Sequence, residues 1–388
     1  MKRKKVSEMA KQIRGVSYKT EDLHENLDEN SVTLLRANNI FEGRINFDDV
    51  VYVDKSRVAR EQYLCKGDIL VCASSGSKQL VGKAASFNFD TECTFGAFCK
   101  VVRPNQDVAN YLSMYFQSNA YRRKISEVAI GANINNIRNE HIDALELPIG
   151  SNAENEEVVA SFSLLQQIID GRKQQLHKLD ELIKARFIEL FGDPMTDVSK
   201  WSASTIGEQF NVASGGTPAT GEKAYWENGT IPWIGSNMCQ DTMLSENDGK
   251  FITEEGYAHS STKWFHKGTV LVALVGATIG KTALLRFDTT INQNIAAIDV
   301  TPNAAFLSEF VFYHMQMLYS KFMEIGSGKF KMANQGFIRQ LPLICPPMEL
   351  QKQFAAFVEQ TDKSKVAVQK ALGEAQLLFD SLMQKYFG

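Results

Sequence analysis

The stretch Lys66–Val71, with the sequence Lys-Gly-Asp-Ile-Leu-Val, is repeated in the second half of the chain as Lys267–Val272, with the sequence Lys-Gly-Thr-Val-Leu-Val. A second pair follows the same order. Leu147–Ile149 (Leu-Pro-Ile) precedes one long helical pattern, and Leu341–Ile344 (Leu-Pro-Leu-Ile) precedes another. The copies lie about half the chain apart. The sequence therefore predicts a tandem repeat in which a globular unit and a long helix occur twice.

The composition is that of a globular protein with ordinary cores. A chain of 388 residues with 44% hydrophobic residues has room for two or three domains. It contains no apolar run long enough for a transmembrane helix. The basic start Met1–Lys5 is followed by polar residues, so we expect no secretory signal. The six cysteines form no Cys-x-x-Cys pair, which favours reduced thiols in a cytoplasmic protein.

The formal net charge of −3 argues against a protein that coats DNA without specificity. It leaves room for a sequence-specific DNA-binding protein, because local basic patches can contact phosphates while the remaining surface stays acidic.

Short apolar runs between glycine-rich and serine-rich turns predict strands over Val32–Leu35, Ile69–Cys72, Ile231–Ile234 and Val270–Ala273. The same order in each half continues with a predicted helix, over Val108–Ser126 in the first half and over Ala305–Lys321 in the second.

The two long helical patterns carry apolar residues every seven positions, as in a coiled coil. In the first, one stripe is Phe162, Ile169, Leu176, Ile183 and Leu190, and the second is Val158, Leu165 and Leu179. In the second helix, one stripe is Phe354, Val368, Ala375 and Leu382, and the other is Leu350, Phe357, Ala371 and Leu378. Each helix should span roughly 35–40 residues, or about 55–60 Å. Since neither helix can bury its own stripe, we expect an antiparallel pair with one globular unit at each end, related by a pseudo-two-fold axis. A helical hairpin that only fills a core is the alternative.

These patterns predict an α+β protein with two similar mixed α/β units joined by two long antiparallel, coiled-coil-like helices. The expected segments are a first unit over residues 1–150, a central helix over 151–195, a second unit over 196–345 and a C-terminal helix over 346–388.

The stretch Gly276–Thr282 is similar to a phosphate-binding P-loop, but it has three residues where the P-loop has four. Its repeat, Gly76–Ala84, has five and lacks the hydroxyl that binds magnesium. A phosphate-binding loop needs a fixed number of residues between its glycines, and the two copies differ in this number. A nucleotide hydrolase with a coiled-coil arm therefore stays only as the alternative function.

Other catalytic signals are missing from the sequence. It has no Asn/Asp-Pro-Pro-aromatic motif for amino methylation, and its six histidines are scattered without metal-ligand spacing. We therefore expect a binding protein with no active site and no metal site of its own.

A protein with two similar units on a spacer suits a ligand with two separated sites, and double-stranded DNA is such a ligand. Polar loop residues can pair with base edges and phosphates. Each such loop by itself could be an ordinary polar turn, but the loops recur at matching places. The candidate contacts are Arg36, Asn38, Asn39, Ser75, Ser77, Lys78, Asn133, Asn135, Asn136 and Arg138 in the first half, and Ser236, Asn237, Thr278, Lys281, Asn292, Gln293, Lys329, Lys331 and Asn334 in the second.

The second half also carries a combination of motifs found in one protein family. The motifs are Ser214–Pro218 (Ser-Gly-Gly-Thr-Pro), Tyr225-Trp226, Ile231–Ile234 (Ile-Pro-Trp-Ile), Lys267-Gly268, Val275–Lys281, Asn292–Asn294 (Asn-Gln-Asn), Leu341-Pro342 and Pro346–Gln351. In this combination the chain resembles the DNA specificity subunit of type I restriction–modification systems. The first half lacks the Gly-Gly-Thr-Pro and Tyr-Trp elements, and only the duplication identifies it as a second unit of the same kind.

The resemblance implies that residues 1–150 and 196–345 are target recognition domains, each specific for one half of a bipartite, asymmetric DNA target. It implies that the helix pair sets the half-site spacing and docks two methyltransferase subunits, which ATP-dependent restriction subunits join for cleavage. S-adenosylmethionine, ATP and magnesium would then belong to the partner subunits, and this chain would be a non-catalytic restriction system component.

Overall fold

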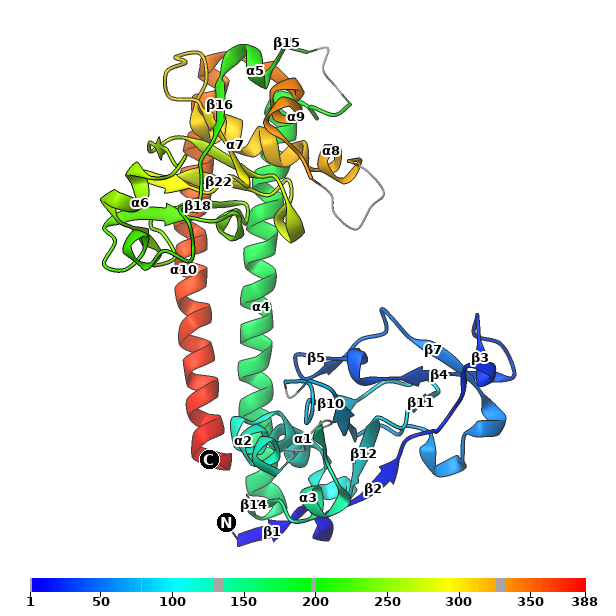
Figure 1. Ribbon diagram of the computed structural model, residues 1–388. Helices are drawn as coiled ribbons and strands as arrows, with labels where there is room; N and C mark the ends of the chain where they lie inside the picture. The colour runs from blue at the N-terminus through cyan, green and yellow to red at the C-terminus, as the bar shows by residue number, and fades with distance from the viewer. Residues whose placement is uncertain (1, 78, 129–134, 197–199, 326–331) are drawn as a thin grey trace. The chain divides into compact units, whose positions relative to one another are not determined.

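The computed structural model describes residues 2–77, 79–128, 135–196, 200–325 and 332–388 (Figure 1). By its internal contacts the chain divides into two compact units. Unit 1 comprises Met1–Lys173 and Lys370–Gly388, and unit 2 comprises Gln174–Gln369. Each unit therefore contains part of both long helices. The division of the chain into four consecutive segments stays a prediction.

Unit 1 is built around two four-stranded sheets. The order of the first is β10 (Ala84–Phe87), β8 (Asp68–Cys72), β12 (Cys99–Pro104) and β2 (Ala10–Arg14), and all its pairs are antiparallel. The order of the second is β11 (Cys93–Phe95), β4 (Ser31–Leu35), β7 (Val51–Asp54) and β3 (Leu23–His24), in which β11 runs parallel to β4.

Unit 2 repeats this topology. Its first sheet has the order β16 (Asn211–Ser214), β24 (Ile295–Asp299), β21 (Val270–Ala273), β22 (Thr282–Leu285) and β18 (Thr242–Leu244). Its second sheet has the order β19 (Phe251–Ile252), β17 (Ile231–Ile234), β23 (Thr289–Ile291) and β20 (Trp264–Phe265), and β17 runs parallel to β23. The predicted strands and the predicted duplication are thus confirmed. Two edge strands differ between the copies: β18 is added to the first sheet of unit 2, and β20 lies beside β23 in the second sheet, whereas β3 lies beside β7 in unit 1.

Smaller elements also recur. The pair β1 (Lys2–Lys5) and β14 (Glu146–Ile149) corresponds to the pair β15 (Ser202–Thr205) and β25 (Pro342–Cys345). The helix before the second strand of each pair is α3 (Asn139–Asp143) or α9 (Gln335–Gln340). Unit 1 further contains the pairs β5 (Ile40–Phe41) with β6 (Arg44–Ile45) and β9 (Ser74–Ser75) with β13 (Asn135–Asn136). Unit 2 contains α5 (Ile206–Gln209) and α6 (Glu254–Ala258). The short 3₁₀ helices are η1 (Val6–Glu8), η2 (Thr20–Asp22), η3 (Ala37–Asn39), η4 (Lys55–Arg57), η5 (Arg60–Gln62), η6 (Gln106–Val108), η7 (Lys223–Tyr225), η8 (Ser236–Met238) and η9 (Gly276–Thr278).

The two mid-length helices were each predicted as one helix, and each is interrupted. The first consists of α1 (Ala109–Gln117) and α2 (Asn119–Val128), and the second of α7 (Ser308–Met317) and α8 (Tyr319–Met323). Ser118 causes the first break, because its backbone is extended and its Oγ accepts a hydrogen bond from the Tyr121 N–H at 3.1 Å. Serine is a preferred N-cap, so it ends one helix and begins the next.

The long helices α4 (Asn152–Phe191) and α10 (Met348–Phe387) each contain 40 residues, as predicted (Figure 1). In unit 2 they are antiparallel, since Asp180 pairs with Lys365 at 2.6 Å and Phe187 packs against Phe354. In unit 1 the start of α4 lies beside the end of α10, where the Phe162 ring contacts the Phe379 ring. A pseudo-two-fold relation between the units stays a prediction.

One predicted stripe of α10 is wrong by one residue. Phe354, Val368 and Ala375 of the first stripe are buried as expected, but Leu378, the last residue of the other stripe, is 51% exposed. Its predicted place is taken by Phe379, whose ring lies 5.2 Å from that of Phe162. Positions three and four residues away from an apolar residue share one face of a helix, so the sequence pattern accepts either.

Each unit buries the helix stripes in its own core. In unit 2, the Phe187 ring packs against Phe310 of α7 at 5.7 Å and against Phe354 of α10 at 5.4 Å. In unit 1, Phe387 of α10 contacts Tyr111 and Tyr115 of α1. Edge-to-face and offset-stacked aromatic pairs like these stabilise a core beyond their buried area. No described helix has both the length and the apolar content to cross a membrane.

The position of the α10 stripe can be tested with neighbouring substitutions. We expect Phe379→Ala to lower the free energy of unfolding by about 1–3 kcal/mol, because it removes a packed ring. Leu378→Ala, at the exposed position, should change it by less than about 0.5 kcal/mol. Urea unfolding followed by circular dichroism measures both, and a larger loss for Leu378→Ala would show that the predicted stripe is the correct one.

His314 of α7 should make unit 2 sensitive to acid. Burial lowers the pKa of this imidazole to about 4, and its Nε2 hydrogen-bonds the Pro342 carbonyl at 2.9 Å. An unfolded histidine has a pKa of about 6.5, so between these values the unfolded chain binds more protons and stability falls as the pH falls. We expect His314 to contribute a loss of about 2 kcal/mol between pH 7.5 and pH 5.

His314→Gln is the matched control, because glutamine keeps an N–H donor and does not titrate. Urea unfolding at both pH values should show a smaller pH dependence for His314→Gln than for the natural chain. Equal pH dependences would contradict the assignment.

Candidate nucleic-acid interface

Three chain segments lie side by side on unit 1 and form a polar surface, here called patch 1 (residues 73–77, 96–98 and 135–138). Residues 73–77 form the middle segment, which hydrogen-bonds to the segments on either side of it. The N–H groups of Ala73 and Ser74 donate to the Phe98 carbonyl at 2.9 and 3.0 Å, and the Ile137 N–H donates to the Ala73 carbonyl at 2.8 Å. Strand β9 also pairs with β13 across this boundary, with Asn136 opposite Ser74.

Unit 2 carries the same arrangement, here called patch 2 (residues 274–278, 292–294 and 332–335). The Leu274 N–H donates to the Asn294 carbonyl at 2.8 Å, and the Ala333 N–H donates to the Leu274 carbonyl at 2.9 Å. Val275 forms a β-bridge with Met332. The bonds from Ala73 to Phe98 and from Ile137 to Ala73 thus have direct counterparts in patch 2, so the two patches have equivalent backbone frames.

The patches bring together predicted contact residues that lie far apart in the sequence. Patch 1 gathers Ser75, Ser77, Asn136 and Arg138, and patch 2 gathers Thr278, Asn292, Gln293 and Asn334. Within patch 2, Gln293 and Asn334 line a groove of about 460 Å³ together with Asn294 and Lys263. Hydroxyl, amide and cationic groups of this kind can pair with base edges and phosphates.

Some of these side chains shape the patches. The Asn334 Oδ1 accepts from the Phe337 N–H at 2.9 Å and caps α9. Asn292 is buried, and its Oδ1 accepts from the Asn294 N–H at 3.1 Å, which holds the turn. Gln293 is exposed, and its Oε1 accepts from the Thr217 hydroxyl at 2.5 Å. Gln293 is therefore the member of this turn best placed to meet a ligand.

Sequence reasoning missed basic residues that border the patches. Arg14 of β2 lies opposite Lys100 of β12, and the Lys100 ammonium donates to Asn139 Oδ1 at 2.5 Å, next to Arg138. Lys263 lines the groove of patch 2. Their sequence surroundings contain no loop motif, and only the sheet and the packing of distant segments bring them to the patches.

The loops after β4 and β17 adjoin the patches. The Gly96 N–H donates to the Leu35 carbonyl at 3.0 Å, and the Asn292 N–H donates to the Ile234 carbonyl at 3.1 Å. These loops carry the predicted contacts Arg36, Asn38 and Asn39 in unit 1 and Ser236 and Asn237 in unit 2.

The first of these loops is held by Asp49. Its carboxylate pairs with Arg36 at 2.9 Å and accepts from Asn38 Nδ2 at 2.7 Å. Asn39 is fully buried, accepts from the Arg36 N–H at 2.8 Å and donates to the Asp49 carbonyl at 3.0 Å. A buried amide with these partners maintains the loop, so we no longer expect Asn39 to contact DNA. In unit 2, Asn237 Nδ2 donates to Asp248 Oδ2 at 3.4 Å.

Lys281 has a structural role, and its predicted contact with DNA stays a prediction. Its ammonium pairs with Asp241 at 2.9 Å, and this hydrogen bond raises the pKa of Lys281. The same carboxylate accepts from the N–H and the hydroxyl of Thr282 at 3.0 and 3.1 Å. Through Asp241, Lys281 therefore helps to hold the start of β22 in place.

The loop Gly276–Lys281 joins two antiparallel strands, β21 and β22. A P-loop leads from a strand into a helix, whose N-terminal amides bind the phosphate. The nucleotide hydrolase alternative is therefore not supported.

Four predicted contacts, Lys78, Asn133, Lys329 and Lys331, lie outside the described residues, as does the side chain of Asn135. Among the described side chains, no group of three or more histidines, cysteines, aspartates or glutamates is arranged to hold a metal ion.

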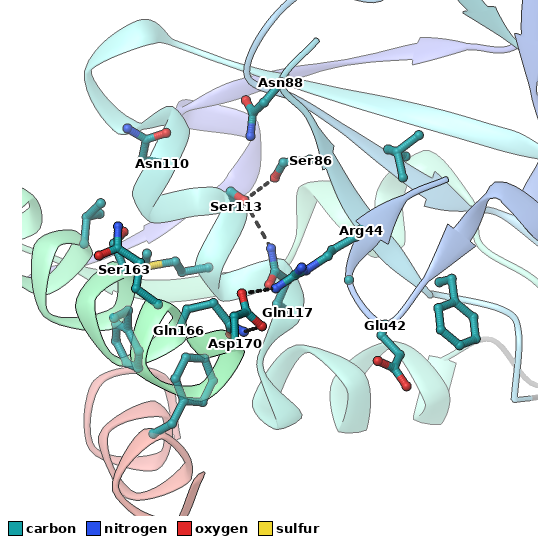
Figure 2. A pocket seen from close by; sticks show the side chains of 18 of the residues that line it. Glu42, Arg44, Ser86, Asn88, Asn110, Ser113, Gln117, Ser163, Gln166 and Asp170 are labelled. Carbon is teal, nitrogen blue, oxygen red and sulfur yellow. Dashed lines mark hydrogen bonds and ion pairs between the residues drawn. The ribbon is translucent and has the colours of Figure 1, made fainter. Parts of the chain in front are cut away.

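Besides the groove in unit 2, the structure has a hollow of about 930 Å³ in unit 1, which the sequence analysis did not predict. Figure 2 shows Arg44 of the β5–β6 hairpin directed toward Asp170 of α4, and the two side chains form an ion pair. Ser86, Ser113 and Gln117 line the same hollow and hydrogen-bond through the Ser113 hydroxyl. Its charged and hydroxyl groups therefore largely satisfy one another.

Comparison with known proteins relates the second half of the chain to one family. Residues 198–375 match the family described as type I restriction modification DNA specificity domain. The specificity subunit of the type I restriction enzyme StySPI from Salmonella potsdam is 38% identical over 180 residues, and that of EcoKI from Escherichia coli K12 is 37% identical over 180 residues. Each match covers 46% of this chain and 39% of the relative, so the chain is aligned with less than half the length of the relatives it matches.

Solved structures extend the likeness in fold to the whole chain. The S subunit of a type I restriction-modification system from M. genitalium aligns over 100% of this chain and 96% of its own, with a TM-score of 0.53 at 15% identity. A structure concerned with assembly and conformational transition of the type I R-M system aligns over 100% and 97%, with a TM-score of 0.58 at 15% identity. The chain is thus similar in fold to these structures, and residues 198–375 match the family of type I DNA specificity domains.

Proposed function

We propose that this chain is the sequence-specific DNA-binding subunit of a type I restriction–modification complex, with patch 1 and patch 2 each recognising one half of a bipartite target. The observation that carries the proposal is the equivalence of the two patches, one of which lies in a DNA specificity domain. The residues on the patches differ, so the two half-sites should differ in sequence.

The chemistry of the patches supports this proposal. Hydroxyl and amide side chains on paired segments suit base edges, whereas the basic residues at the border suit phosphates. Patch 1 is bordered by Arg14, Lys100 and Arg138, and patch 2 by Lys263. Such local positive charge is compatible with the overall net charge of −3.

The surfaces of the long helices support a docking role. Apolar side chains remain exposed along them, including Leu164 and Leu182 on α4 and Val366 and Leu377 on α10. Leu164 and the exposed Ile168 lie four residues apart on one face of α4, and neighbouring exposed apolar side chains are typical of interaction sites. In this proposal two methyltransferase subunits dock there and restriction subunits join them. S-adenosylmethionine, ATP and magnesium act in those subunits, and this chain works in the cytoplasm without catalysing a reaction.

The function can be tested by assembling the chain with its methyltransferase subunits and sequencing the DNA that the complex methylates. We expect one split target with two different half-sites. Replacing residues 196–345 by the same region of a relative should change one half-site and leave the other intact, because the two patches lie on separate units. A change in both half-sites would contradict independent recognition, and methylation without sequence preference would contradict the function.

The role of the helices as a spacer can be tested by removing one heptad from each helix, residues 173–179 of α4 and 366–372 of α10. Seven residues keep the apolar stripes in phase and shorten a helix by about 10.5 Å. This length corresponds to about three base pairs of DNA. Sequencing of methylated DNA should show unchanged half-sites with a shorter gap. An unchanged gap would contradict the spacer role, and deletion of the same heptad from α4 alone is the control for a disrupted pair.

A further inference from the structure

Each patch exposes one large apolar side chain among its polar groups. In patch 1 it is Phe98, which is 71% exposed, and in patch 2 it is Met332, which is 68% exposed. Neither side chain is needed to fill a core, since both lie mostly in solvent. A single exposed apolar side chain is common on protein surfaces, but these two lie on equivalent patches that carry predicted DNA contacts.

The two apolar side chains occupy opposite edges of equivalent patches. Phe98 corresponds to Asn294, because both residues accept the hydrogen bond from the middle segment. Met332 corresponds to Asn136, because both pair with the matching residue of the middle segment, Val275 or Ser74. Patch 1 thus has the apolar Phe98 in residues 96–98 and the amide of Asn136 in residues 135–138. Patch 2 has the amide of Asn294 in residues 292–294 and the apolar Met332 in residues 332–335.

The backbone of patch 1 suits the major groove of DNA. Strands β9 and β13 form an antiparallel two-stranded ribbon, and the major groove admits a ribbon of this kind. Among the base edges in that groove, thymine presents the one apolar group, its 5-methyl. Amide side chains bond to the polar edges of the neighbouring bases.

We propose that Phe98 and Met332 are specificity-determining residues, each of which contacts the 5-methyl group of a thymine in the half-site of its own unit. Asn136 and Asn294 hydrogen-bond neighbouring base edges. The inference rests on the proposed function, and it adds the chemical group that is recognised. Phe98 and Met332 lie on opposite edges of equivalent patches. The thymine contacted by unit 1 therefore lies at a different position along its half-site from the thymine contacted by unit 2.

Uracil substitution in the DNA tests the proposal, since uracil differs from thymine only by the lost methyl group. With the target known, each thymine of a half-site is replaced in turn by uracil, and binding of the assembled complex is measured by competition. We expect one thymine in the half-site of unit 1 whose replacement weakens binding about fourfold, the factor for one buried methylene-sized group. The Phe98→Ala complex should bind the thymine and uracil duplexes equally at that position.

Matched variants separate this contact from a general loss. Phe41→Ala removes a ring that is 58% exposed in the same unit but outside patch 1, and it should keep the sensitivity to uracil. Met332→Ala should abolish sensitivity in the half-site of unit 2 and leave that of unit 1 unchanged.

Three results would overturn the inference while the proposed function stands. The natural complex recognises a split target but tolerates every uracil and is unaffected by Phe98→Ala, or Phe98→Ala keeps its uracil sensitivity, or the natural complex tolerates every uracil and Phe98→Ala weakens binding to all duplexes. The last result indicates a ring inserted between bases instead of a methyl contact. A complex without any preferred target overturns the proposed function itself.

Discussion

The burial of the apolar stripes of α4 and α10 is the constraint on which both units depend. A single helix cannot cover its own stripe, and each unit solves this with aromatic residues from three elements. In unit 2, Phe187, Phe354 and Phe310 form one packed group, and in unit 1, Phe162 and Phe387 join Tyr115 of α1. Consequently the first unit along the chain includes the last turns of the last helix, where Met383 and Phe387 are buried. Unit 1 therefore needs residues 370–388 of α10 to complete its core.

The duplication preserves the backbone and changes the side chains. Backbone hydrogen bonds join equivalent segments within patch 1 and within patch 2, and the strand order of the main sheets recurs apart from their edge strands. The groups presented on this frame differ, as Phe98 corresponds to Asn294 and Asn136 to Met332. A frame that is held by backbone hydrogen bonds tolerates such exchanges, because the bonds do not depend on which side chain is present. This property suits a protein whose two halves bind different sequences.

Sequence patterns succeeded where one local rule decides the outcome. Ile231–Ile234 and Val270–Ala273 are strands with the predicted bounds, since short apolar runs between turns have few other solutions. The predicted helix over Ala305–Lys321 failed at its start and at Leu318, where the chain breaks between α7 and α8. The stripe with Leu378 failed because spacings of three and four residues are equivalent until the partner helix is in place. Asn39 and Lys281 were chosen as exposed polar loop residues, but Asp49 and Asp241, which are distant in sequence, bind them into the loops.

The sequence by itself determined that the chain is duplicated, that two long helices carry heptad stripes and that the Gly276–Lys281 loop has the wrong length for a phosphate cradle. These features depend on periodicity and spacing, which are properties of the chain alone. Only the tertiary structure decided which polar residues share a surface, that Arg14, Lys100 and Lys263 border it, and that Phe98 and Met332 lie on opposite edges. Those facts depend on strand pairing between segments far apart in the sequence, and local patterns contain no information about that pairing.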